Sequence, residues 1–202
     1  MRSDIIHVKS DGTGIEEALT QAERVARYKG LAKKPTIHLR LLTEELMGMV
    51  KGMTGVLDAE FWIEDVDNAF QLHLRTDTAM NTKLRRELLS VSTSGSNEAA
   101  KGVTGKIREL FEKALEPADN TLTAPYCTGW TFTGADNAAP GMITSGVWSF
   151  NSYKESVRDN ADNAEAREAW DELEKSIIAN LADEVKIWIR NGQVELTVFK
   201  KI

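Results

Sequence analysis

The strongest pattern along the chain is that of an amphipathic helix between residues 36 and 53. Its apolar residues recur at spacings of three and four, so they share one helical face, and charged residues lie opposite. Glu45 lies at the edge of the apolar face, beside Gly48 and Gly52, so a shallow groove adjoins its carboxylate. Either the glycines allow close packing against a sheet and Glu45 reaches solvent, or the groove holds a ligand. The apolar face comprises Leu39, Leu42, Leu46, Met49, Val50 and Met53.

Alternation of apolar and polar residues predicts two β-hairpins. In the first, residues 60–75 alternate around a turn-rich centre at 65–68. In the second, residues 185–198 alternate around Asn191-Gly192, a dipeptide typical of two-residue hairpin turns. Both segments are therefore expected to form antiparallel strand pairs with one face in the core.

Two shorter segments precede the helix that carries Glu45. Residues 5–8 have the composition of a strand, and the capping-box sequence Thr13–Glu16 predicts the start of a helix. That helix is expected to continue to Tyr28 and to stop at Gly30, and Pro35 is expected to open the next one.

Residues 80–162 form a long insert between the first hairpin and the last helix. A helix from Asn97 to Leu115 is expected, followed by a loop-like segment at 118–148 that is unusually aromatic for disorder. The insert is interpreted as a lid in which residues 126–150 pack back on the domain or cover the groove, with a mobile surface loop as the alternative. Beyond it, Asn163 is expected to cap the last long helix. Its predicted inner face comprises Trp170, Leu173, Ile177 and Leu181.

The order of elements is thus β-α-α-β-β, the insert, and then α-β-β. It predicts an α/β (α+β) fold, a two-layer sandwich with helices on one face of a mostly antiparallel sheet. The length of 202 residues fits a single domain, 1–202, that includes the insert at about 80–162.

Composition restricts the classes of partner. A net charge of -6 and a pI near 5.2 argue against a nucleic-acid surface and against an anionic membrane. No run approaches the roughly 18 apolar residues of a membrane span. Cys127 is the single cysteine, so no intramolecular disulfide can form, and a cytoplasmic location is expected. The three histidines are scattered without the spacing of a zinc site.

With these elements in place, the chain resembles the histidine-kinase-type ATPase superfamily (GHKL, Bergerat fold), and within it most closely the anti-sigma-factor serine kinases. A strand and helix lead into a Gly30-Leu31 turn and then the helix that carries Glu45. Asp77 follows the first hairpin, and the closing segment 177–201 resembles the last helix and strand pair of the family. The resemblance covers about residues 4–79 and 163–201.

The resemblance implies an ATP-binding regulatory protein with a protein partner, and it is compatible with a homodimer. Glu45 would then be the catalytic general base, and Asp77 would bind the adenine amino group. Gly48, Met49 and Gly102 complete the implied nucleotide-binding set, together with Glu45.

Three departures from the family pattern change the expected chemistry. Met49 occupies the place of the Mg²⁺-binding asparagine, and a thioether is a poor ligand for a hard ion. The two glycines expected after Asp77 are also absent. So are the glycines expected before the last helix, where backbone N–H groups would hold phosphates and the chain reads Asn160-Ala161-Asp162-Asn163. We therefore expect neither Mg²⁺ binding nor a metal site formed by the protein. Little or no turnover is expected as well. The alternative function is a non-catalytic protein-interaction module that has lost ATP binding.

Overall fold

The computed structural model describes residues 1–53, 57–67, 69–77, 102–114, 130–132, 145–160, 164–190 and 193–202. Within these ranges the chain forms one seven-stranded sheet in the order β1-β2-β3-β7-β6-β5-β4, and every neighbouring pair is antiparallel. The strands are β1 (Ile6–Lys9), β2 (Asp58–Val66), β3 (Ala69–Asp77), β4 (Trp130–Phe132), β5 (Ser145–Ser149), β6 (Glu184–Arg190) and β7 (Gln193–Lys201).

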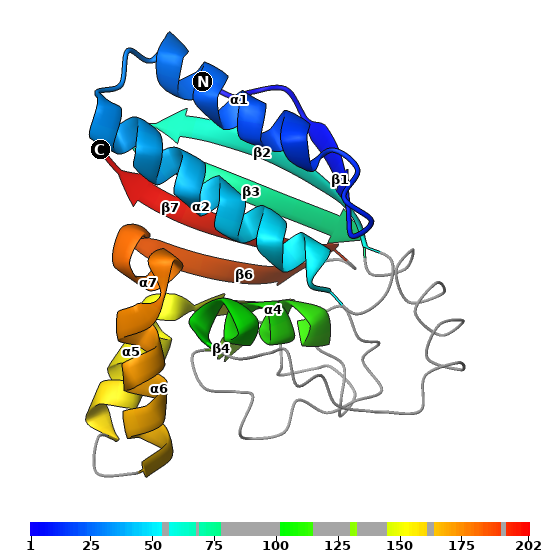
Figure 1. The fold of residues 1–202 in the computed structure, drawn as a ribbon. Coiled ribbons are helices and arrows are strands. Elements are labelled where there is room, and N and C mark those ends of the chain that lie inside the picture. Colours follow the sequence, from blue (N-terminus) through cyan, green and yellow to red (C-terminus); the bar gives the residue numbers. More distant parts are fainter. Residues whose placement is uncertain are drawn as a thin grey trace.

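Helices and sheet form two layers, as the sequence predicts. Figure 1 shows α1 and α2 side by side in front of the part of the sheet built from β1, β2, β3 and β7, while the other helices gather beside β6, β5 and β4. The helices are α1 (Ile15–Tyr28), α2 (Lys33–Lys51), α4 (Gly102–Ala114), α5 (Phe150–Asp159), α6 (Ala164–Lys175) and α7 (Ile177–Leu181).

The amphipathic pattern of α2 is confirmed. All six residues of the predicted apolar face are buried, and Leu39, Leu42, Leu46 and Val50 are 0% exposed. Burying a leucine side chain contributes about 1.5–3 kcal/mol relative to leaving it in water. The predicted start is two to three residues late, because Pro35 is the third helical residue, where the missing N–H has no helical partner to lose. The helix ends at Lys51 with Gly52 as its C-cap, so the predicted end is too late as well.

The predicted capping box at the start of α1 is wrong. Gly14 is the N-cap, with φ of 77°, and no side chain caps the helix. Thr13 belongs instead to the turn after β1, where its amide donates to Asp11 and its carbonyl accepts from Lys9. A Cβ at Gly14 would overlap the carbonyl oxygen of His7, so this tight turn requires glycine. The stop at Gly30 is confirmed by its φ of 63° just after the helix.

Both predicted hairpins are present with the expected faces. In β2 and β3, Phe61 lies opposite Leu74 and Ile63 opposite Leu72, and all four side chains are buried. In β6 and β7, Ile187 lies opposite Leu196 and Val185 opposite Val198. The two hairpins are joined because β3 pairs with β7, so their apolar faces form one continuous apolar surface of the sheet that packs against the helices.

The insert contributes to the sheet, which the sequence analysis did not predict. Trp130–Phe132 and Ser145–Ser149, within or next to the segment interpreted as a loop, form the edge strand β4 and its neighbour β5, which pairs with β6. The helix predicted from Asn97 is observed from Gly102, and Asn97 itself lies outside the described residues. Most of the segment 118–148 also lies outside them.

The last long helix is divided in two. Ser176 separates α6 from α7 and caps α7 by accepting a hydrogen bond from the amide of Ala179. Trp170 and Ile177 are 39% and 41% exposed, contrary to the predicted inner face. For Ile177 the break is the reason, because it changes the helical phase of α7 relative to α6. Leu173 is buried as predicted, and in α7 Ile178 is buried where Ile177 was expected.

We expect Gly14→Ala to destabilise the fold by about 2 kcal/mol or more, because alanine is strained at positive φ and its methyl group would meet backbone. Gly48→Ala is the matched control: Gly48 lies inside α2, and a methyl group added there would have no atom within 4 Å. That change should stabilise the protein by about 0.5–1 kcal/mol. Chemical denaturation measures both, and equal effects of the two substitutions would contradict this account.

Candidate functional site

Glu45 lies where α2 meets α4. Its side chain is half-buried, and its carboxylate accepts a hydrogen bond of 2.9 Å from the hydroxyl of Thr104 in the first turn of α4. Sequence periodicity places Glu45 at the edge of the apolar face of α2, and the structure adds a second helix along that edge. The carboxylate therefore has a fixed orientation, which a group that aligns a water or a ligand requires.

Gly48 in α2 and Gly52 at its C-cap have different surroundings, and neither brings the helix close to the sheet. Gly48 is exposed, and a Cβ there would meet no atom within 4 Å. At Gly52 a Cβ would overlap the Nη1 atom of Arg108, which comes from α4. The interpretation that these glycines serve close helix–sheet packing is therefore wrong. Gly48 keeps the surface next to Glu45 open, and Gly52 makes room for a guanidinium.

Arg108 is the most unusual charged residue among those the structure describes. It is 8% exposed, and its Nε and Nη2 atoms are buried without a hydrogen-bond partner. It lies one helical turn after Thr104, so both side chains leave α4 on the side that faces α2. Both side chains thus contact the C-terminal half of α2 and its cap, Thr104 at Glu45 and Arg108 at Gly52.

The other residues of the implied nucleotide set have distinct positions. Met49 is 1% exposed and belongs to the apolar core. Asp77 is the last residue of β3 and is exposed. Gly102 is the first residue of α4, two positions before Thr104. Figure 1 shows the C-terminal ends of α2 and β3 at the same end of the two layers, so Glu45 and Asp77 belong to elements that converge there.

Sequence analysis missed Thr104 and Arg108. The amphipathic pattern of α4 carries a usable signal, because its apolar residues Val103, Ile107, Leu110 and Phe111 mark a buried face that Arg108 adjoins. An arginine next to such a face is a candidate for a buried charge. Its contact with α2 cannot be inferred in this way, since it depends on how the two helices pack.

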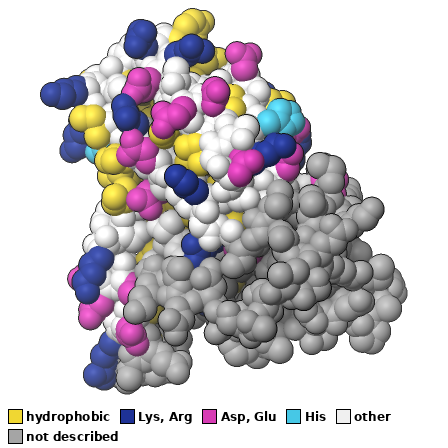
Figure 2. All heavy atoms as spheres, turned by 45° about the vertical axis from the view of Figure 1, so that its right-hand side comes forward, with side chains coloured by type: hydrophobic (Ala, Val, Ile, Leu, Met, Phe, Trp, Pro, Cys, Tyr) yellow, Lys and Arg dark blue, Asp and Glu magenta, His cyan; other side chains and the backbone are white. Residues whose placement is uncertain are grey.

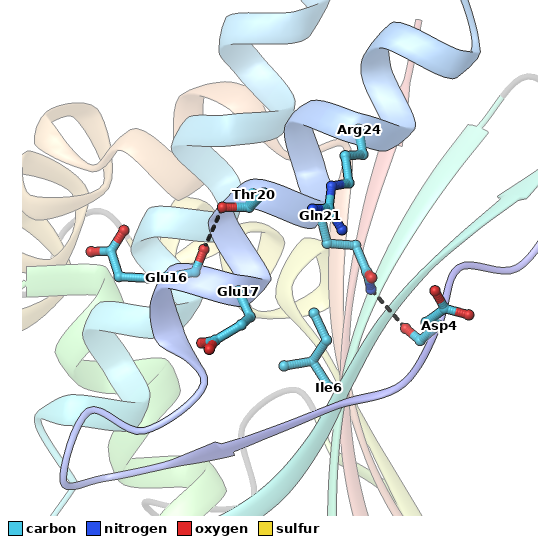
Figure 3. A pocket seen from close by; sticks show the side chains of 7 residues that line it. All are labelled: Asp4, Ile6, Glu16, Glu17, Thr20, Gln21 and Arg24. Carbon is cyan, nitrogen blue, oxygen red and sulfur yellow. Dashed lines mark hydrogen bonds between the residues drawn. The ribbon is translucent and has the colours of Figure 1, made fainter.

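A separate surface depression of about 470 Å³ lies beside α1 (Figure 3). Its lining contains three acidic side chains and one arginine, so it would repel an anionic ligand such as a nucleotide. Its central polar group is already paired, because Gln21 donates hydrogen bonds to Ser3 and to the carbonyl of Asp4. The lining residues are Asp4, Ile6, Glu16, Glu17, Thr20, Gln21 and Arg24.

The sheet face turned away from α2 carries a polar and aromatic cluster, which we call the Trp62 cluster. The rings of Trp62 and His73 stack with centroids 4.7 Å apart, and the guanidinium groups of Arg2 and Arg75 lie over the indole at 4.6 and 5.1 Å. These neighbours leave Trp62 only 3% exposed. The Trp62 cluster thus covers part of this face with its own side chains.

Glu195 connects the Trp62 cluster to β7. Its carboxylate accepts a hydrogen bond of 2.8 Å from Nδ1 of His73 and one of 3.3 Å from Thr197. Burial raises the pKa of Glu195, but the hydrogen bond and charge of His73, the Thr197 hydroxyl and the charge of Arg75 together outweigh it. The pKa therefore lies below its usual value of about 4.5.

Comparison of the chain with protein-family models, with curated proteins and with solved structures finds no match. Within the described ranges, no helix is long and apolar enough to cross a membrane. The same residues contain no group of three or more His, Cys, Asp or Glu side chains that could hold a metal ion. On the face drawn in Figure 2, acidic and basic side chains are interspersed over the described surface, without the basic area that binds nucleic acid.

We expect Glu195→Gln to weaken the fold near neutral pH and to lose this effect in acid. Because the folded-state pKa is lowered, the ionised carboxylate stabilises the protein above about pH 4.5, and this contribution disappears as the pH falls through the folded-state pKa. Unfolding free energies of wild type and variant, measured from about pH 7 down to pH 3, should therefore converge. Glu168→Gln, an exposed change on α6, is the control. A difference between wild type and Glu195→Gln that does not depend on pH would contradict the assignment.

Proposed function

We propose that this protein is an ATP-binding regulatory protein of the histidine-kinase-like ATPase type, similar to an anti-sigma factor, with little or no turnover. The observation that carries the proposal is the position of Glu45. Its carboxylate is half-buried, oriented by Thr104, and adjoined by the open surface at Gly48. The family resemblance assigns a glutamate at this helix position to the nucleotide site.

The order of elements supports the same proposal. The chain begins with β1-α1-α2-β2-β3 and ends with α7-β6-β7, which is the order on which the resemblance rests. Asp77 ends β3, and the resemblance gives an aspartate after this strand the role of binding adenine. In this proposal the insert at 80–162 contributes the lid, and α4 is the described part of it that reaches the helix with Glu45.

Low turnover follows from the surroundings of Met49. Its thioether is 1% exposed among apolar side chains, so this helix position offers no oxygen to a magnesium ion. Phosphoryl transfer depends on positioning the phosphates and on neutralising their charge, and Mg²⁺ contributes to both. A rise of about 1.4 kcal/mol in the activation free energy lowers the rate tenfold. Glu45 would still orient a water or a hydroxyl, but a slow reaction or none is expected.

The second candidate is a protein-interaction module without nucleotide. The same buried Met49 and the absent glycines after Asp77 favour it. So does Trp188, a large aromatic side chain of β6 that is 42% exposed. In either case we propose that the protein acts on a protein partner in the cytoplasm, as a monomer or a homodimer.

We expect wild-type protein to bind ATP with the same affinity, within about threefold, with and without Mg²⁺, because no side chain of α2 holds the ion. Asp77→Asn should weaken binding about tenfold or more, since an amide replaces the carboxylate that would accept from the adenine amino group. Isothermal titration calorimetry measures both effects.

Asp171→Asn, which removes an exposed carboxylate from α6, is the matched control and should bind ATP like wild type. Absence of ATP binding at about 5 mM would reject the nucleotide proposal in favour of the interaction module. Binding that requires Mg²⁺ would keep the nucleotide proposal but contradict the role given to Met49.

A further inference from the structure

The guanidinium of Arg108 is buried without the partner that a buried charge needs. Arginine stays protonated in proteins, so burial cannot be relieved by loss of a proton. Buried charges are normally paired, because desolvation is costly when no counter-charge compensates it. Arg108 is 8% exposed, yet its Nε and Nη2 atoms have no hydrogen-bond partner. Among the described residues, no hydrogen-bond partner compensates this edge of the buried Arg108 charge.

The two unpaired atoms belong to the same edge of the guanidinium. The N–H groups of Nε and Nη2 point in parallel, and this edge forms bidentate hydrogen bonds with planar or tetrahedral oxyanions. The remaining nitrogen, Nη1, lies against Gly52. The edge suited to a bidentate anion is thus the edge without a partner.

The end of α2 helps to keep this charge in place before a ligand arrives. Gly52 is the C-cap, and the C-terminal end of a helix carries partial negative charge. Because Gly52 has no Cβ, the guanidinium can lie directly against the helix end. This favourable field accounts for the position of Arg108 but leaves its hydrogen-bonding edge unused.

Glu45 is not the missing counter-charge. Its carboxylate accepts a hydrogen bond from Thr104, one turn earlier on α4, and it forms no ion pair with Arg108 among the described residues. The junction of α2 and α4 therefore holds a carboxylate and, one helical turn away, an unpaired cation. An anion bound to Arg108 would lie beside the group that is proposed to orient a water or hydroxyl.

We propose that Arg108 binds the phosphate chain of the ligand at the junction of α2 and α4. This inference rests on the proposed function for the identity of the ligand as a nucleotide, but the arginine would bind free polyphosphate by the same chemistry. The chain lacks the glycines that the family resemblance leads us to expect after Asp77 and before the last helix, the latter with backbone N–H groups that would hold the phosphates. In a nucleotide complex the guanidinium of Arg108 would supply phosphate hydrogen bonds in their place.

The test compares ATP, adenosine and inorganic tripolyphosphate as ligands of wild type, Arg108→Gln and Arg108→Lys, by isothermal titration calorimetry. Arg108→Gln should weaken ATP and tripolyphosphate binding about 10- to 100-fold and leave adenosine unaffected. Arg108→Lys keeps the charge but loses the bidentate edge, so an intermediate loss is expected, and it replaces Arg108→Gln if that variant does not fold. Arg158→Gln, an exposed change on α5, is the matched control.

Thermal unfolding without ligand supplies a second readout. If Arg108 serves a ligand, its buried and unpaired charge destabilises the free protein. Arg108→Gln should therefore leave the melting temperature unchanged or raise it. A large fall in melting temperature in both variants, with unchanged affinity for tripolyphosphate, would show that Arg108 is structural and would overturn the proposal.

The ligand set separates this proposal from the proposed function. ATP binding that is equal in wild type and Arg108→Gln overturns the role of Arg108 and leaves the nucleotide function standing. Tripolyphosphate binding that depends on Arg108, without binding of ATP or adenosine, supports the anion site and rejects the nucleotide function. No binding of any of the three by wild type at about 10 mM overturns both.

Discussion

Burial of one face of α2 is the constraint on which the rest of the structure depends. This helix contacts α1, α4 and α7 and also the strand β1, so three other helices are placed relative to the sheet partly through it. Its fully buried leucines lie in one apolar cluster with residues from both hairpins and from α4. Because a packed core tolerates little change in volume or orientation, the polar edge of α2 is held rigidly as well. The position of Glu45 follows from the packing of its neighbours.

The junction of α2 and α4 combines three features that the stability of the fold does not explain. A half-buried carboxylate accepts a hydrogen bond from a hydroxyl group, and a buried guanidinium lacks hydrogen bonds on one edge. An exposed glycine is kept inside α2, where alanine would form a better helix. Such local costs are often found at binding sites, where a ligand later satisfies them. The three features coincide within about two turns of α2, which is why we assign the site to this junction.

The parts of the fold that could be predicted are those governed by local periodicity. The apolar face of α2 and both hairpins follow from spacings of three to four and of two, because each residue's burial is set by its own element. The start of α1 could not be predicted, since Gly14 is selected by contact with the backbone of β1, and neither could the break at Ser176 that buries Ile178 instead of Ile177. The site divides in the same way: Glu45 was found as a polar residue at the edge of an apolar face, whereas Thr104 joins it from 59 residues away.

The central claim, that the junction of α2 and α4 is the nucleotide site, is tested most directly by amide hydrogen exchange with and without ATP. Ligand binding slows exchange where it suppresses local opening. The account predicts slower exchange in residues 45–52 of α2 and 102–108 of α4, with the hairpin of β6 and β7 unchanged. Protection confined to α1 and its acidic depression, or an exchange pattern that ATP leaves unaltered at saturating concentration, would contradict it.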